Sequence, residues 1–321
     1  MTYPLPTVHV LYENPDWLPP LIQGLHAEGF MVDLVPIDGG AIDPNQPPSE
    51  GIWLNRISPS SHTRDHHHSV GMTREILFWL ENWGRRVING LSAYELEMSK
   101  ARQDQILRKH GIRTPKTVLA AGRPATLKLA AGFDGPFITK HNQGGKGLGI
   151  DLFESVDKLA EYLDSPDFDP GPNGQIILQE YISAPSPFIT RVEIVGDRFL
   201  FAMRSSTETG FQLCPSDACQ LQAQGPDVCP IDGGSKFSPS PITADDPLVR
   251  KYIKMCQAEG IDVAGIEFIE DQNGNRLTYD INGTTNYNSV LGEQIGIDGM
   301  RELARLVKQE VLEDKPISFS A

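Results

Sequence analysis

The chain has 321 residues, of which 39% are hydrophobic and 22% are charged. This composition is typical of an ordinary soluble globular protein. Its 28 lysines and arginines against 42 aspartates and glutamates leave a net charge of −14, which argues against nucleic acid or an anionic membrane as a partner. No apolar run is long enough to span a membrane and no signal peptide is indicated, so the cytoplasm is the expected compartment.

The first part of the chain alternates short apolar segments with helical ones. This alternation predicts an α/β domain built on a doubly wound parallel sheet. The domain is expected to close near Ser92 and is assigned residues 1–95. Its expected strands cover residues 7–12, 31–35, 52–56 and 87–88, and its expected helices cover residues 19–28 and 72–83.

A polar loop rich in hydroxyl groups and cations follows the third expected strand. Ligands of open α/β sheets bind beyond the carboxyl ends of the strands, so this loop is a candidate for binding a substrate that bears a carboxylate. The alternative is a solvated loop. Three adjacent histidines cannot all face one point, so a complete metal site is not expected here. The candidate contacts are Arg56, Ser58, Ser60, His62 and Arg64.

Two further domains are expected, over residues 96–183 and 184–321. Ser99 can cap a helix that runs to Lys109, and this helix opens the second domain. Further strands are expected over residues 117–119, 136–140, 151–153, 176–182, 189–195, 199–204 and 263–269. Helices are expected over residues 155–163, started by Ser155, over residues 247–259, capped by Asp246, and over residues 299–312.

The expected strand over residues 136–140 ends in Lys140 and leads into a loop with four glycines in six residues, Gly144-Gly145-Lys146-Gly147-Leu148-Gly149. The bare N–H groups of such a loop can close over phosphate oxygens, and the lysines supply positive charge. The pattern is neither a Walker A motif nor G-x-G-x-x-G, and protein-kinase motifs are absent. Nucleotide binding is the leading interpretation, and a glycine-rich hairpin without a ligand is the alternative.

Two later segments carry polar groups suited to a nucleotide. Gln179, Glu180, Tyr181 and Ile182 end a strand whose backbone can hydrogen-bond an adenine ring. Arg191 and Arg204 sit near the outer ends of the hairpin that turns at Gly196-Asp197. Arginine binds two oxygens of a phosphate or carboxylate at once, although a surface ion pair is an equally ordinary use of it.

Residues 205–241 lack periodicity and are long for a structureless connection, so a functional loop or lid is expected there. The segment holds Cys214, Cys219 and Cys229, at spacings that fit no paired zinc knuckle. Free thiols are the default in a reducing compartment. A zinc site closed by Cys256 or a histidine is left open.

An acidic hairpin follows, with two apolar runs flanking the turn Asn273-Gly274. Symmetric pairing about that turn puts Glu267 opposite Asp280, with Asn282 on the same face as Asp280. Opposed like charges are destabilising unless a cation lies between them, and oxygen ligands suit Mg²⁺ or Mn²⁺. The alternative is a solvated acidic face.

With these motifs in order, the chain resembles an ATP-grasp ligase and is similar to the RimK-type glutamate ligases and bacterial glutathione synthetases. The resemblance covers about residues 96–290 and, more loosely, the domain before it. It implies an ATP-grasp fold preceded by a pre-ATP-grasp α/β domain. It also implies ATP and two Mg²⁺ ions as the cofactors.

Residue roles also follow from the resemblance. Lys100 and Lys140 would contact phosphates under the glycine loop, and residues 179–182 would hold adenine. Glu267, Asp280 and Asn282 would bind the metal ions, with Arg204 at the transferred phosphate and Arg191 as a further catalytic residue. Two departures from the family pattern matter. Ile189 stands where an Asp is usual, which weakens inferences about contacts near Arg191, and Glu267 and Asp280 exchange the usual Asp and Glu while keeping both carboxylates.

The expected activity is that of an acid–amino-acid ligase. A substrate carboxylate attacks the γ-phosphate of ATP, and an amine then attacks the acylphosphate to form an amide, with ADP and phosphate released. Thr284, Thr285, Asn286 and Asn288 are candidate substrate contacts, or they only shape a loop. A non-catalytic nucleotide-binding regulatory protein and a zinc-dependent protein are the alternatives. The acid and amine, free or at a peptide terminus, and the oligomeric state, a homo-oligomer included, are left open.

Overall fold

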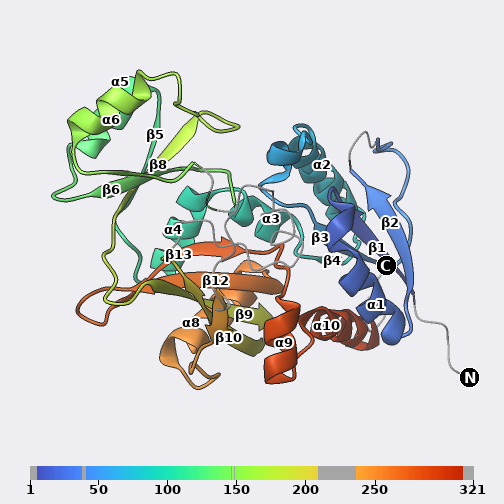
Figure 1. The fold of residues 1–321 in the computed structure, drawn as a ribbon. Helices are drawn as coiled ribbons and strands as arrows, with labels where there is room; N and C mark the ends of the chain where they lie inside the picture. The colour runs from blue at the N-terminus through green and yellow to red at the C-terminus, as the bar shows by residue number, and fades with distance from the viewer. Residues whose placement is uncertain (1–5, 38–40, 146, 148, 209–235, 314–321) are drawn as a thin grey trace, which may run out of the picture.

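A computed structural model describes residues 6–37, 41–145, 147, 149–208 and 236–313 of the chain. Within them the strands form three sheets, each with its own helices (Figure 1). One sheet is parallel and the other two are antiparallel, so the predicted α/β class with α+β lobes is confirmed. No helix among the described residues is long and apolar enough to cross a membrane.

The N-terminal sheet is parallel, in the order β2-β1-β3-β4, with helices on both faces. α1 and the last described helix, α10, pack on one face through Leu21, Leu25 and Leu303, whereas α2 packs on the other face through Leu77 and Leu80. α10 therefore joins the core of the N-terminal sheet although it is distant from it in sequence. The elements are β1 (Thr7–Tyr12), η1 (Pro15–Trp17), α1 (Pro19–Ala27), β2 (Met31–Pro36), β3 (Ile52–Arg56), η2 (Ser61–Arg64), α2 (Ser69–Asn82), β4 (Val87–Ile88) and α10 (Gly299–Glu313).

The second sheet is antiparallel in the order β5-β8-β6-β7 and is covered on one face by two helices that stand together in Figure 1. Phe137, Phe153 and Leu159 fill the core between sheet and helices. The opposite face carries Lys140 and Gln179, because side chains alternate along a strand. The elements are β5 (Thr117–Ala121), α5 (Arg123–Ala130), β6 (Phe137–His141), β7 (Asp151–Phe153), α6 (Val156–Leu163) and β8 (Gln175–Glu180).

The third sheet has the order β11-β10-β9-β12-β13, and its core with α8 is formed around Val192, Ile266 and Tyr252. α3 and α4 lead from the N-terminal sheet into the second one, and α4 contacts β13 on the way. The elements are α3 (Leu91–Glu97), α4 (Lys100–Lys109), β9 (Phe188–Val195), β10 (Arg198–Ser206), β11 (Phe237–Pro239), α8 (Pro247–Glu259), β12 (Val263–Glu270), β13 (Arg276–Asn282) and α9 (Ser289–Ile295).

In the hairpin of β12 and β13, Glu267 pairs with Asp280 as predicted, but the strands contain an irregularity that was not predicted. Phe268 pairs with Thr278, Glu267 pairs with Asp280, and Tyr279 is the extra residue of a bulge between them. A symmetric turn would have left the strands without this irregularity. Glu267 and Asp280 are opposite each other because the bulge shifts the register by one residue.

Most predicted elements are present, and Ser99, Ser155 and Asp246 cap helices as expected. Three helices, α3, α5 and α9, were not predicted. Cys214, Cys219 and Cys229 lie outside the described residues, as does most of the expected lid. Cys256 is a residue of α8 and is buried in the core between that helix and the third sheet. No group of three His, Cys, Asp or Glu side chains suited to a metal ion occurs among the residues that the structure describes.

Candidate functional site

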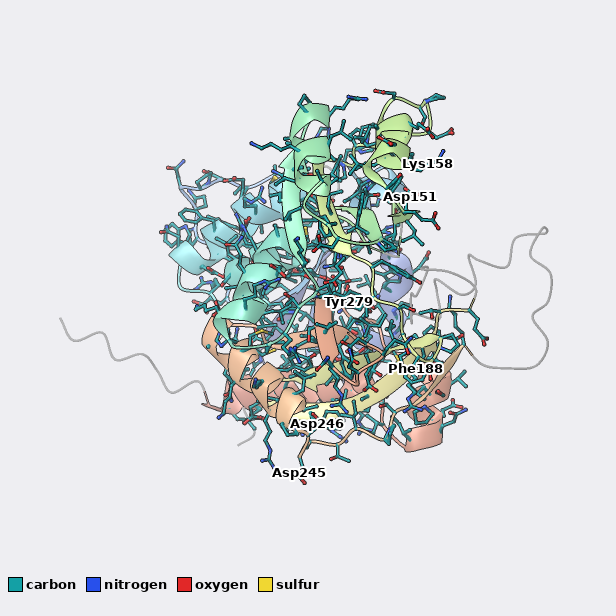
Figure 2. The ribbon with its side chains drawn as sticks, turned by 90° about the vertical axis from the view of Figure 1, so that its left-hand side faces the viewer. Asp151, Lys158, Phe188, Asp245, Asp246 and Tyr279 are labelled. Carbon is teal, nitrogen blue, oxygen red and sulfur yellow. The ribbon has the colours of Figure 1, made fainter. Side chains whose placement is uncertain are left out.

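A cleft of about 520 Å³ lies between the second and third sheets and reaches the loop that follows β3. Figure 2 shows Tyr279, one of its lining residues, between the green helices of the second sheet and the yellow strands of the third. The structure thus brings together residues that are up to 269 positions apart, from Trp17 to Asn286. Predicted site residues in its wall are Ser58, Ser60, Lys100, Lys140, Gly144, Gly145, Gly147, Gln179, Glu180, Tyr181, Ile182, Arg191, Glu267, Asp280, Asn282, Thr284 and Asn286.

Lys140 is almost fully buried at the end of β6. Its Nζ donates to Gln179 Oε1 at 2.9 Å and lies 5.4 Å from the centre of the Tyr279 ring. Burial, and then repulsion from Lys100, lowers the pKa of Lys140 to about 7. A poorly compensated ammonium group at a cleft wall is a site at which an anion is stabilised.

Lys100 is the first residue of α4, and its Nζ donates to Asp280 Oδ1 at 2.5 Å. The backbone carbonyl oxygen of Asn142 accepts from Lys100 N at 3.0 Å, and the Asn142 side chain accepts from Ala101 N at 3.0 Å. Asn142 directly follows β6, so one residue ties the start of α4 to the strand that carries Lys140. The two lysines therefore have a fixed relation to each other.

The wall of the cleft opposite Lys140 is the hairpin of β12 and β13. Burial, with the negative charge of Asp280 in addition, raises the pKa of Glu267, and Arg191 acts against this. Burial acts in the same direction on Asp280, but the charges of Lys100 and Lys140 hold the pKa of Asp280 below its ordinary value. One carboxylate is thus more basic than normal and the other more acidic.

The donor set of this hairpin fits a divalent cation. Asn282 Nδ2 donates to the Gly265 carbonyl oxygen at 3.3 Å, which leaves the amide oxygen of Asn282 available. Each carboxylate oxygen has two lone pairs, so the bonds from Lys100 and Arg191 leave further acceptor capacity on Asp280 and Glu267. All-oxygen ligands with two negative charges suit Mg²⁺ or Mn²⁺.

Arg191 lies on β9, the strand beside this hairpin, and its buried side chain is the centre of a polar network. It donates from Nε to Glu193 Oε1 at 2.6 Å, from Nη1 to Glu267 Oε1 at 2.9 Å and from Nη2 to Thr285 Oγ1 at 2.9 Å. Burial opposes its charge, but Glu193 and Glu267 raise the pKa of Arg191 overall. A Cβ on Gly265 would lie 2.0 Å from Arg191 Nη2, so the guanidinium occupies the space above that glycine. Arg191 thus orients Glu267.

The expected place of Arg204 beside the transferred phosphate does not agree with the structure. In the register of β9 and β10, Met203 pairs with Arg191 and Arg204 pairs with Thr190, so Arg204 is on the opposite face of the sheet from Arg191. Its guanidinium lies 4.4 Å from the ring centre of Phe188, which is labelled in Figure 2. The position of Arg204 near the end of a hairpin in the sequence did not reveal on which face of the sheet its side chain lies.

The polar loop after β3 divides into structural and cleft-facing residues. Arg56 is buried, donates to the Thr285 carbonyl oxygen at 3.0 Å and also donates to the Asn286 side chain. Arg64 donates to both carboxylate oxygens of the buried Glu13. His62 bonds through Nδ1 to the Pro59 carbonyl oxygen at 3.1 Å. Arg56, His62 and Arg64 are outside the cleft wall, whereas Ser58 and Ser60 are in it.

The loop after β13 shows a similar division. Thr285 is buried between Arg191 and Glu193, and Asn288 caps α9 by accepting from Leu291 N at 2.8 Å. Neither lines the cleft, whereas Thr284 and Asn286 do. Arg56 therefore supports the loop that carries Asn286. Its bonds connect the loop after β3 with the loop after β13, the two segments that were predicted to contact substrate.

The glycine-rich loop is packed against His141, which sequence reasoning had not singled out. A Cβ on Gly149 or on Gly171 would lie 2.7 Å from the His141 ring, so both glycines are needed for this approach. A Cβ on Gly145 would lie 3.5 Å from Ser60 Cβ, so the glycine-rich loop approaches the loop after β3. Lys146 lies outside the described residues.

Comparison with known proteins bears on this arrangement. Residues 98–213 match the family model described as the RimK-like ATP-grasp domain. This part of the chain is therefore similar to a RimK-like ATP-grasp domain. The matched range of this ATP-grasp domain begins just before Lys100 and includes Lys140, the glycine-rich loop and Arg191.

A curated relative and two solved structures agree with this assignment. The chain is 23% identical to the alpha-aminoadipate–LysW ligase LysX of Sulfolobus acidocaldarius over 71% of this chain and 75% of that protein. The RimK domain ATP-grasp protein of Sphaerobacter thermophilus aligns with a TM-score of 0.66 at 16% identity, covering 94% and 98% of the two chains. The ATP-grasp ligase PsnB, complexed with a minimal precursor, Mg and ADP, aligns with a TM-score of 0.63 at 14% identity, covering 97% and 99%. The fold is therefore the ATP-grasp fold.

Several residues of the ATP-grasp cleft were not found by sequence reasoning. Glu97, Trp17 and Tyr279 line it, and Tyr279 donates to Glu267 Oε2 at 3.2 Å. Glu97 and Tyr279 had a signal, because each is close in sequence to a predicted ligand, Lys100 and Asp280. Trp17 had none, since only the tertiary structure brings η1 to the cleft.

Proposed function

We propose that this protein is an ATP-dependent carboxylate–amine ligase that forms an amide bond on an amino acid or peptide through an acylphosphate. The observation that carries the proposal is the convergence of Lys100, Lys140, Glu267 and Asp280 with a glycine-rich loop on one cleft. Its relatives and structural neighbours are named as ligases, which favours this activity over a non-catalytic nucleotide-binding role.

In the proposed complex the triphosphate lies between Lys140 and the hairpin. Lys140 is held by Gln179 and has no carboxylate at ion-pair distance among the described residues, so its charge is available to phosphate oxygens. Lys100 can share its charge between Asp280 and a phosphate. The N–H groups of the loop at Gly144, Gly145 and Gly147 would cover the phosphates and exclude water.

The metal site proposed here consists of Glu267, Asp280 and Asn282, and two Mg²⁺ ions are the expected number. When bound, Mg²⁺ supplies positive charge that neutralises the phosphate oxygens as phosphoryl transfer proceeds. Arg191 and Tyr279 both donate to Glu267, so they hold this carboxylate toward the cleft. The orientation of the acidic pair is set before any ligand enters.

Adenine would lie at the other end of the cleft, against residues 179–182 where the second and third sheets are joined. The substrate carboxylate would lie toward Ser58, Ser60, Thr284 and Asn286, on the side of the N-terminal sheet. Arg56 supports this end from behind and is assigned a structural role in the proposal. No protein nucleophile is required, because the cleft mainly positions reactants and neutralises charge.

The experiment is an incubation of the full chain with ATP, Mg²⁺ and a panel of amino acids and short peptides. The expected products are ADP, phosphate and an amide identified by mass spectrometry. Formation of AMP and pyrophosphate would contradict the acylphosphate route. Tight ATP binding without any product over the whole panel would favour a regulatory role instead.

Three further expectations complete the proposal. The assigned domains are residues 1–95, 96–183 and 184–321, although α10 packs on the first of them. We propose the cytoplasm as the compartment, because ATP and reduced thiols such as Cys256 are found there. Neither nucleic acid nor a membrane is an expected partner, and the oligomeric state is left for measurement by light scattering.

A further inference from the structure

Glu97 is a buried carboxylate in the cleft wall to which the proposed mechanism gives no role. It ends α3, and its side chain faces the loop after β13. Glu97 Oε1 accepts from Thr284 N at 2.9 Å, and Oε2 accepts from Thr284 Oγ1 at 3.1 Å. Both oxygens keep a second lone pair, and the residue is 7% exposed toward the cleft.

The position of Glu97 along the cleft is set by its distance from Lys100 in the chain. Lys100 bonds to Asp280 in β13. Glu97, which precedes Lys100 by three residues, bonds to Thr284, which follows Asp280 by four residues. The carboxylate of Glu97 is therefore next to the proposed phosphate end, displaced toward Ser58 and Asn286. This is where a second substrate would approach an acylphosphate.

The charges around Glu97 leave its carboxylate without a neutralising partner. The other acidic residues near it in the wall are held by cations, Asp280 by Lys100 and Glu267 by Arg191. Within the described part of the chain, no lysine or arginine forms an ion pair with Glu97. Burial is the largest effect and raises the pKa of Glu97 to about 7, although the bonds from Thr284 and the charge of Arg56 act against it.

We propose that Glu97 binds the ammonium group of the amine substrate and accepts its proton. The inference rests on the proposed ligase function. An ammonium group would supply the missing positive charge, and its N–H groups can donate to the free lone pairs of both oxygens of Glu97. Thr284 keeps the carboxylate in place while this happens.

The proton balance is complete with the groups at hand. The ammonium group loses one proton to Glu97 and becomes a neutral amine with a free lone pair. The amine nitrogen then bonds to the acyl carbon, the bond from that carbon to the bridging phosphate oxygen breaks, and phosphate leaves. The nitrogen loses a second proton, which the departing phosphate takes. Glu97 returns its own proton to solvent at the end of the cycle.

The test compares a charged and an uncharged nucleophile in the Glu97→Gln variant of the full chain. Hydroxylamine is neutral at pH 7 and needs no base, whereas methylamine is protonated. The glutamine keeps both contacts with Thr284, because its oxygen can accept from Thr284 N and its amide can donate to Thr284 Oγ1. The acid substrate is first identified by screening acids for hydroxamate formation with the unaltered protein. With that acid, the Glu97→Gln variant should form the methylamide about 100-fold more slowly or worse, and the hydroxamate about threefold more slowly at most.

Two results would overturn the inference. One is an unchanged ratio of methylamide to hydroxamate in Glu97→Gln, which would mean that Glu97 only holds the loop. The other is a wild-type protein that forms hydroxamate but no methylamide, since no group would then accept the ammonium proton. Thr284→Val is the comparison variant, and by weakening the loop it should lower both rates by the same factor. Absence of hydroxamate with every acid would instead contradict the proposed function itself.

Discussion

Glu267 on β12 lies directly opposite Asp280 on β13, and the bulge at Tyr279 is what brings the two carboxylates into register. Each has one cation on its outer side, Arg191 for Glu267 and Lys100 for Asp280. The side chains are thereby held with their charges side by side, which is costly unless a further cation joins them. This pair is the centre of the proposed site, and the first prediction concerns it.

Replacing Asp280 with Asn should abolish ligation and leave the fold intact. The change removes one of two carboxylates from the proposed metal site and breaks the 2.5 Å bond with Lys100, but the side chain keeps its size. We expect a loss of turnover of about 100-fold or more, with the dependence of ATP binding on Mg²⁺ also lost. Turnover assays and titration of ATP with and without Mg²⁺ measure both effects.

The control for this variant is Asp245→Asn. Asp245 is exposed and bonds only to Arg250 through the pairs that the structure describes, and Figure 2 shows it at the bottom of the view, well away from Tyr279. Its replacement should leave turnover unchanged. Unchanged activity in Asp280→Asn as well would remove the metal assignment.

Binding of ATP should be accompanied by proton uptake at Lys140. The pKa of Lys140 in the free protein is about 7, so at pH 8 about nine-tenths of the molecules have the neutral amine. Phosphate oxygens stabilise the ammonium form, which raises the pKa of Lys140, and binding at pH 8 should therefore take up close to one proton. At pH 6 the side chain is already charged, and the uptake should disappear.

Calorimetry of ATP binding in buffers with different ionisation enthalpies measures this proton count. ATP affinity should fall as the pH rises above 7, because charging Lys140 then costs free energy. The Lys140→Met variant should lose the uptake together with most of the affinity. A proton count near zero at pH 8 in the unaltered protein would exclude Lys140 as a phosphate contact.

Gly265→Ala should destabilise the protein through the Arg191 network. The added Cβ would lie 2.0 Å from Arg191 Nη2, and the guanidinium cannot move without losing bonds to Glu193 and Glu267. We expect the free energy of unfolding to fall by about 1–3 kcal/mol. Turnover should also fall, because Glu267 loses its orientation. Denaturant unfolding measures the first effect.

The matched control is Gly71→Ala in α2. A Cβ there meets nothing within 4 Å, and alanine favours a helix over glycine, so stability should rise by about 0.5–1 kcal/mol. Equal stabilities for the two alanine variants would contradict the close contact between Gly265 and Arg191.

Arg204→Met should have little effect on turnover. Arg204 packs against Phe188 on the face of the sheet opposite Arg191, and its Nε has no hydrogen-bond partner among the described residues. We expect the kcat to stay within about threefold and stability to fall by about 1 kcal/mol from the lost contact with the ring. A loss of turnover of 100-fold or more, with stability maintained, would contradict this expectation and support the predicted role of Arg204 beside the transferred phosphate.

Local patterns were sufficient for much of the fold. Strand-length apolar runs, the caps Ser99, Ser155 and Asp246, and the Gly196-Asp197 turn are local signals, and the structure contains the elements that they predict. α3, α5 and α9 have seven or eight residues, which is too short for a clear helical period. The Asn273-Gly274 turn was placed correctly, but the bulge at Tyr279 depends on packing that no local pattern encodes.

What the sequence by itself determined is the set of chemical groups and their order: a lysine at the end of a strand, a glycine loop, and two carboxylates with an amide on one hairpin. These follow from short-range rules of alternation and turn geometry. Only the tertiary structure decided which polar side chains face the cleft. Arg204 and Arg56 are not among its lining residues, whereas Glu97 and Trp17 are, because this depends on register and on which segments fold together. Those choices rest on contacts between residues far apart in the chain.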